Sequence, residues 1–186
     1  MDPKGAWRRR YRAKEAAVPA LPGDYAALMW GVMELYESAA ADKQKKDWLR
    51  YAENLAVKLE ENFWDEPKGG FFLSLESEAH VFLRLKSASD DAAPSANAMA
   101  MMAYAALARA VPDNKKYADT AKAISSCFAR RAIANPLEHI SIYTASMKLK
   151  AVKGAKEERA SDDEKDGEKD LVNNDEKPDF RLDRRR

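Results

Sequence analysis

Apolar and polar positions alternate along the chain in a way that predicts helices of two kinds. Residues 24–39, DYAALMWGVMELYESA, carry apolar side chains on two adjacent helix faces, which is typical of a helix packed on several sides. Residues 46–63 form one apolar stripe opposite a charged face, so this helix is expected to be half-exposed. The same two kinds recur in residues 95–110 and 115–131, and a further helix is predicted after Pro136.

Nearly apolar and amphipathic helices in this order indicate stacked helical hairpins. Each hairpin leaves an apolar face that a neighbouring hairpin has to cover. The sequence therefore predicts an all-α fold of about five helices. In the last helix, the apolar positions expected on one side are Leu137, Ile140, Tyr143 and Met147.

A short β-hairpin is predicted between the second and third helices. Residues 72–75 and 81–85 alternate apolar and polar positions, as strands do. Gly69 and Gly70 precede them and allow the chain to turn. We expect this hairpin to lie at one rim of the helical array.

Composition divides the chain into three parts. Residues 1–20 form a basic segment, and residues 21–152 hold the predicted helices. In residues 153–186, charges of both signs dominate and almost nothing is available to bury. Such a segment cannot offset the entropy cost of ordering, so a disordered tail is predicted there.

The composition also argues against several classes of function. The 186 residues include 32 basic and 31 acidic side chains, whereas an electrostatic nucleic-acid binder needs a concentrated basic face. No apolar run is long enough to span a bilayer, and the first residues lack the apolar core of a signal peptide. The single cysteine, Cys127, cannot form an intramolecular disulfide and is expected to be a small buried side chain. We therefore predict a cytoplasmic protein that binds neither nucleic acid nor membrane.

Signatures of common cofactors are missing from the sequence. It has no paired-cysteine zinc spacing, H-E-x-x-H helix, glycine-rich phosphate loop or nucleophile elbow. No metal and no nucleotide cofactor are predicted.

The stretch SDDAAPSANAMA, residues 89–100, places two acids, a serine and an asparagine ahead of an apolar helix. In the favoured interpretation it starts that helix: Asp90 or Asp91 forms a turn, Pro94 suits the first helical turn and Ser95 caps it. In the alternative, the same acids and the amide of Asn97 form one wall of a polar pocket.

Two further places combine an acid with an aromatic side chain. Asp24, next to Tyr25, would cap the first helix or, alternatively, contribute to a pocket. Trp64 and Asp65 follow the second helix, where they would form an apolar plug and a turn. Their alternative role is a sugar-stacking ring beside a carboxylate.

Glycoside cleavage needs two carboxylates on opposite sides of the scissile bond. Asp24, Asp65, Asp90 and Asp91 could supply such a pair, and we take Asp24 and Asp90 as the catalytic candidates. The five remaining candidates for ligand binding are Tyr25, Trp64, Asp65, Ser95 and Asn97.

His80 and His139 are the only histidines and form a second candidate pair. Two histidines could move protons as in a sugar epimerase, although a structural role is favoured for each.

Three segments in order resemble a known family: residues 8–39, then NFWDEPKGGFFLS (62–74), then DDAAPSAN (90–97). They are similar to the C-terminal half of the thioredoxin-domain-containing proteins of the YyaL and spermatogenesis-associated type. The family pattern D-Y-A falls on residues 24–26. Its F-x-D and G-G-F-F fall on Phe63, Asp65 and residues 69–72, and its D-x-A-x-P-S-G-N falls on Asp90, Ala92, Pro94, Ser95 and Asn97. The chain departs from the pattern at Gly23, where the family has an acid, and at Ala96, where it has glycine.

This resemblance implies part of an (α/α)6 toroid, related to N-acylglucosamine 2-epimerases and six-hairpin glycosidases and preceded in the family by a thioredoxin-like domain. It implies a carbohydrate-like ligand, with the reaction left open. Because such a toroid needs about twelve helices, we expect the chain to be the closing part of a longer protein. Its expected partners are the missing toroid half and thioredoxin-like domain, or a second copy of itself. The alternative is a non-enzymatic scaffold or interaction module, or a degenerate fragment without independent activity.

Overall fold

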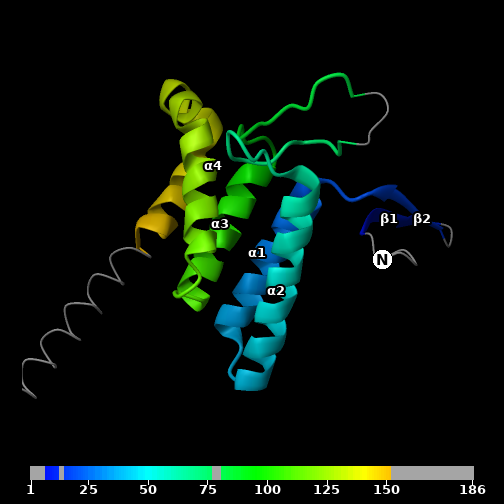
Figure 1. The fold of residues 1–186 in the computed structure, drawn as a ribbon, viewed down its shortest axis with the longest axis vertical. Coiled ribbons are helices and arrows are strands. Elements are labelled where there is room, and N and C mark those ends of the chain that lie inside the picture. Colours follow the sequence, from blue (N-terminus) through cyan, green and yellow to red (C-terminus); the bar gives the residue numbers. More distant parts are fainter. Residues whose placement is uncertain (1–6, 13–14, 77–80, 152–186) are drawn as a thin grey trace, which may run out of the picture. The chain divides into compact units, whose positions relative to one another are not determined.

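The computed structural model describes residues 7–12, 15–76 and 81–151 (Figure 1). The predicted disordered tail, 153–186, lies outside the described residues. The elements in chain order are β1 (Arg8–Arg12), β2 (Glu15–Pro19), α1 (Pro22–Ser38), α2 (Asp42–Phe63), α3 (Ala96–Ala110), α4 (Lys115–Ala134) and the 3₁₀ turn η1 (Pro136–His139). A further helix covers residues 140–151. The prediction of a mostly helical fold is confirmed.

The helices pair as two hairpins, α1 with α2 and α3 with α4, and α1 packs against α3 (Figure 1). Short connections join the members of each pair, residues 39–41 in the first and 111–114 in the second. The long connection, residues 64–95, lies at the other end of the helices. We call this the loop end; it holds the first turns of α1 and α3.

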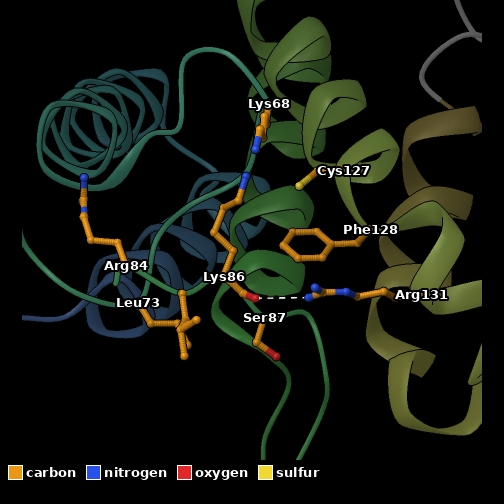
Figure 2. A pocket seen from close by; sticks show the side chains of 9 residues that line it. Lys68, Leu73, Arg84, Lys86, Ser87, Cys127, Phe128 and Arg131 are labelled. Carbon is orange, nitrogen blue, oxygen red and sulfur yellow. Dashed lines mark hydrogen bonds between the residues drawn. The ribbon is translucent and has the colours of Figure 1, made fainter. Parts of the chain in front are cut away.

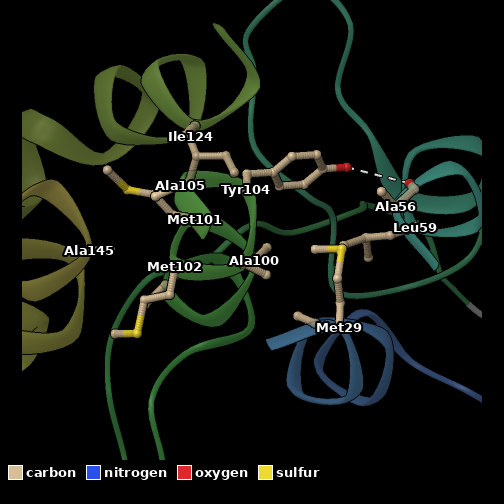
Figure 3. Packing of buried hydrophobic residues seen from close by; sticks show 14 of the residues in the cluster. Met29, Ala56, Leu59, Ala100, Met101, Met102, Tyr104, Ala105, Ile124 and Ala145 are labelled. Atoms are coloured by element: carbon tan, nitrogen blue, oxygen red, sulfur yellow. Dashed lines mark hydrogen bonds between the residues drawn. The ribbon is translucent and has the colours of Figure 1, made fainter. Parts of the chain in front are cut away.

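Helix α3 forms the centre of the core. Eleven of its fifteen residues are buried, and most of these are alanine or methionine. Small side chains let neighbouring helices approach closely, while methionine fills the irregular gaps between them. Figure 3 shows Met29 of α1, Leu59 of α2 and Ile124 of α4 around residues of α3. The nearly apolar pattern of residues 95–110 is explained by this position.

The amphipathic helices α2 and α4 bury one stripe each and expose the opposite face, as predicted. Two tyrosines join them to each other and to α3. The Tyr104 hydroxyl donates to Glu60 Oε1 at 2.8 Å, and the Tyr117 hydroxyl donates to Glu53 Oε1 at 2.9 Å. Burial raises the pKa of Tyr104 well above its ordinary value and that of Tyr117 to about 12, so both remain hydrogen-bond donors at neutral pH.

The prediction of strands at 72–75 and 81–85 is wrong within the described residues. These segments approach each other, because the Leu73 N–H donates to the Leu85 carbonyl at 2.8 Å, but they form no ladder. Arg84 explains this in part: its guanidinium donates to the Ser74 carbonyl, an acceptor that a partner strand would need, and to the Asn62 carbonyl in the last turn of α2. The hairpin that the structure contains is β1–β2, an antiparallel pair in which Arg8 faces Pro19.

The β1–β2 hairpin is attached to the helices through the residues that flank it. The Ala20 N–H donates to the Trp7 carbonyl at 3.1 Å, and the Trp7 ring meets that of Tyr51 edge-on with centroids 6.2 Å apart. Ala20 is buried in the core. The chain on both sides of the hairpin therefore contacts the helical core.

The last helix faces the core with a different side from the one that the sequence suggested. Ile142, Ala145 and Leu149 are buried, whereas four of the apolar residues at its start and along it are exposed: Leu137, Ile140, Tyr143 and Met147. This segment is apolar on two sides, so periodicity alone could not select the buried one. Among the helices of the described residues, none has the length and apolar character to cross a membrane.

Candidate functional site

The first turns of α1 and α3 lie side by side at the loop end. A Cβ placed on Gly23 would lie 3.8 Å from the Ala96 Cβ. The end of α2 joins them, because the Tyr25 and Phe63 rings are 6.0 Å apart. All seven candidate residues therefore lie at one end of the helical array, although they have different local roles.

Asp90 connects the starts of two helices. Its Oδ1 accepts from the Ser95 N–H at 3.0 Å and its Oδ2 from the Ser141 N–H at 2.8 Å. Its own N–H donates to the Glu138 carbonyl at 2.7 Å. A carboxylate is favoured at helix N-termini, where backbone N–H groups lack partners. Both oxygens of this catalytic candidate thus stabilise the fold.

Ser95 and Asn97 also bind backbone groups. Ser95 is the N-cap of α3, accepting from the Ala98 N–H at 3.3 Å, as the capping interpretation predicted. Asn97 is fully buried and pairs with both backbone groups of Phe71: Oδ1 accepts from its N–H at 2.7 Å, and Nδ2 donates to its carbonyl at 3.0 Å. Nδ2 also donates to the Ser87 carbonyl at 2.8 Å. Asn97 therefore holds the loop against α3.

Trp64 and Asp65 close the turn after α2. The half-buried Trp64 ring packs against Phe71 with centroids 5.0 Å apart. The buried Asp65 accepts from Lys86 Nζ at 2.6 Å, and its carbonyl accepts from the Gly69 N–H at 2.8 Å. The hydrogen bond from Lys86 holds the pKa of the Asp65 carboxyl below its ordinary value.

Asp24 and Tyr25 line a pocket between α1 and the β1–β2 hairpin. We call this the Asp24 pocket; its volume is about 120 Å³. Asp24 Oδ2 accepts from the Leu21 N–H at 2.8 Å, while Oδ1 lies 3.6 Å from Arg9 Nε. Burial raises the pKa of the Tyr25 phenol. The residues that line the Asp24 pocket are Trp7, Arg8, Arg9, Ala20, Asp24, Tyr25 and Leu28.

The histidine pair cannot be assembled from the described residues, because His80 lies outside them. His139 is buried, and its Nδ1 lies 2.9 Å from the Asn135 carbonyl oxygen. This contact fits the structural role favoured for it. In the part of the chain that the structure describes, no group of three or more His, Cys, Asp or Glu side chains could hold a metal ion.

A second pocket, of about 630 Å³, lies between the 65–87 loop and α4 (Figure 2). We call it the cationic pocket, because Lys68, Arg84, Lys86 and Arg131 contribute to its lining. The remaining lining residues are Leu73, Leu85, Ser87, Cys127 and Phe128. The sequence does not indicate this pocket, because no residue spacing predicts that these segments lie together. Cys127, expected to be buried, is half-buried and lies at its wall.

The described residues define an all-α protein of stacked helical hairpins, with the Asp24 pocket and the cationic pocket at the loop end. Over 77 residues, the chain is 40% identical to spermatogenesis-associated protein 20 of Mus musculus and to that of Homo sapiens. The rat protein of the same name (Rattus norvegicus) is 39% identical over the same length. Each match covers 41% of this chain but 9% of the relative. No family model matches the chain. The chain is thus homologous, over this stretch, to a small part of a much longer protein.

Proposed function

We propose that the chain forms the ligand-binding end of a helical-hairpin toroid and binds a carbohydrate-like ligand at the Asp24 pocket. The observation that carries this proposal is the parallel start of α1 and α3, which gathers the candidate residues at the end where that pocket opens. The partial homology to spermatogenesis-associated protein 20 supports it, as does the resemblance to the family with an (α/α)6 toroid.

The lining of the Asp24 pocket suits a neutral polyol. Trp7 and Tyr25 offer aromatic surface to C–H faces, and Asp24 and Arg9 offer an acceptor and a donor for adjacent hydroxyls. A volume of about 120 Å³ limits the bound part to one small ring or less. The ligand would therefore be held at one end, with the rest of it outside the pocket.

We propose that this chain binds the carbohydrate-like ligand but does not hydrolyse it on its own. Of the acidic residues in the described part of the chain, Asp24 is the one that lines this pocket, whereas glycoside cleavage uses two carboxylates. Asp90, the second candidate, uses both oxygens for backbone N–H groups. A second carboxylate would come from the rest of the toroid, which we propose as the partner of this chain together with a thioredoxin-like domain.

A saccharide titration tests this proposal. Glucose, N-acetylglucosamine and maltose are titrated into the full chain, with ligand-induced shifts of the melting temperature and calorimetric heats as readouts. We expect saturable binding to at least one of them. Asp24→Asn should raise its Kd about tenfold, the effect of losing one charge-assisted hydrogen bond, while the amide oxygen still accepts from Leu21. Asp47→Asn, an exposed carboxylate in α2, is the matched control.

Absence of any saturable response, or equal Kd values for wild type and Asp24→Asn, would overturn the proposal. A scaffold function is the second candidate, because the exposed Leu137, Ile140 and Met147 leave apolar surface at the last helix uncovered. A flat saccharide response together with association through this surface would favour it.

A further inference from the structure

We propose that the cationic pocket binds an organic phosphate monoester. This proposal does not depend on the Asp24 pocket, because the two pockets share no lining residue. The ligand proposed for the cationic pocket is an anion, whereas the ligand proposed for the Asp24 pocket is neutral.

The first support is the charge of the lining. Four of the nine residues are cationic and none is acidic. The Asp65 carboxylate pairs with Lys86 and compensates one of these charges. The pocket therefore keeps an excess of positive charge, although the chain as a whole carries +1. A hollow lined by one sign of charge concentrates ligands of the other sign.

The cations divide into two that are bound to the protein and two that are available. The Arg84 guanidinium donates to the Ser74 and Asn62 carbonyls and lies over the Phe72 ring. Lys86 Nζ donates to Asp65 and, at 2.6 Å, to the Gly69 carbonyl. These bonds fix the two side chains in place and identify them as part of the wall.

Lys68 and Arg131 are the available pair. Both are exposed, and no carboxylate of the described residues lies within ion-pair distance of either. Arg131 Nη1 donates one long bond, 3.4 Å, to the Lys86 carbonyl, which leaves other donors of its guanidinium to face a ligand. Figure 2 shows the side chains of Lys68, from the loop, and Arg131, from α4. An anion bound here would pair with cations that lack a carboxylate partner among the described residues.

The geometry selects a phosphate on an organic group. A dianion with several acceptor oxygens can bind an ammonium and a guanidinium at once. A bare phosphate would leave most of the 630 Å³ empty. Leu73 and Leu85, exposed by 38% and 60%, provide apolar wall for the remainder of the ligand.

Cys127 provides a readout inside the pocket, because it is the chain's one cysteine. The full chain is alkylated with neutral iodoacetamide in the presence of increasing phenyl phosphate, and the modified fraction is followed by mass spectrometry. Parallel arms contain inorganic phosphate, phenol, or sodium chloride at matched ionic strength. We expect phenyl phosphate to slow alkylation about fivefold or more in a saturable manner, inorganic phosphate to protect only at higher concentration, and the other two arms to have no effect.

Substitution assigns the protection to the proposed residues. The double variant Lys68→Gln with Arg131→Gln should raise the half-protecting concentration of phenyl phosphate at least about tenfold. The matched control is Lys122→Gln with Arg130→Gln, two exposed cations of α4 outside the pocket lining. The single variant Lys68→Gln, at an exposed turn residue, should raise the half-protecting concentration of phenyl phosphate by a smaller factor. It replaces the double variant in the test if the double variant is unstable.

Three results would overturn the proposal. The first is an alkylation rate unaffected by phenyl phosphate, and the second is protection by sodium chloride equal to that by phenyl phosphate, which would indicate charge screening only. The third is unchanged protection in the pocket variants. Equal protection by inorganic and phenyl phosphate would overturn the organic part of the ligand assignment.

Discussion

Buried and half-buried polar side chains at the loop end satisfy backbone groups of other segments. Asn97 pairs with Phe71 and Ser87, and Asp90 pairs with Ser95 and Ser141. An unpaired buried N–H or carbonyl costs about 1–3 kcal/mol, so these side chains allow an irregular loop to lie against a close-packed helix. The same residue types that predict a pocket in the sequence can serve this need.

At the residue scale, the Asp65–Lys86 pair predicts how the free energy of unfolding depends on pH. Its carboxyl has a lower pKa in the folded protein than in the unfolded chain, where it is about 3.9. The pair with Lys86 therefore stabilises the fold above about pH 4, and this contribution is lost as the pH falls toward the folded-state pKa. In Asp65→Asn, we expect the free energy of unfolding to decline less steeply between about pH 5 and pH 3 than in wild type, as measured by urea denaturation.

The control for this measurement is Asp47→Asn. Asp47 pairs with Arg50 on the surface of α2, with its side chain 56% exposed, and such pairs contribute little. The free energy of unfolding of Asp47→Asn should depend on pH in the same way as that of the wild type. An Asp65→Asn profile that also follows the wild type would contradict the stabilising role assigned to the Lys86 pair.

At the scale of elements, the turn after α2 depends on two glycines with positive φ. Gly69 has φ 69° and Gly70 has φ 78°. A Cβ on Gly69 would lie 2.9 Å from the Ala123 carbonyl oxygen, and one on Gly70 would lie 3.1 Å from Phe128 Cε2. The turn therefore packs directly against α4, which links the first helical hairpin to the second.

Two alanine substitutions should change stability in opposite directions. Gly69→Ala should lower the free energy of unfolding by more than about 1–2 kcal/mol, because a left-handed backbone and a backbone clash are combined. Gly31→Ala, in the middle of α1 with no atom near its added Cβ, should raise it by about 0.5–1 kcal/mol. Urea denaturation midpoints compare the two variants. Stabilisation by Gly69→Ala would show that the turn does not have the described conformation.

How much of the fold could be predicted from the sequence also depends on the element. The helices could be predicted because each carries a 3.6-residue apolar period over several turns, and Ser95 because a cap is a local device. The conformation of residues 72–75 and 81–85 could not be predicted, since it depends in part on the hydrogen bond from the Arg84 side chain to the Ser74 carbonyl. The cationic pocket could not be predicted from the sequence either, because tertiary packing alone brings Lys68, Lys86 and Arg131 to one pocket.

For the whole molecule, the main feature is the exposed apolar surface of the last helix. Residues 140–151 bury one side against the core and expose Ile140 by 57% and Met147 by 64%, next to Leu137 at 83%. In a stacked array of hairpins, the next hairpin would cover such a surface. The structure therefore fits a chain that continues its packing with a further part or with a second copy.

We expect the chain alone to self-associate through this surface. By sedimentation equilibrium, its average mass should rise above 20.9 kDa with concentration. Ile140→Glu should keep it near the monomer value, because a charge at the centre of the apolar surface opposes burial. Val57→Glu, 46% exposed on α2, is the matched control and should behave as wild type. A monomer at all concentrations, or equal association of all three proteins, would contradict this prediction.

The unequal connections at the two ends of the helices have a consequence for how such a protein can evolve. Residues 39–41 and 111–114 leave little length to vary, because they hold the members of each hairpin together. The 64–95 connection carries Lys68, Lys86 and Ser87 of the cationic pocket, and its residues differ in burial: Phe71 and Ala88 lie in the core, whereas Phe82 is fully exposed and Leu83 is 72% exposed. Mutations and insertions beside Phe82 can alter the surface near the cationic pocket while the core stays intact. Around Asp65, Gly69 and Asp90, packing and hydrogen bonds constrain the same connection. Selection on recognition therefore conflicts least with stability at the exposed segment.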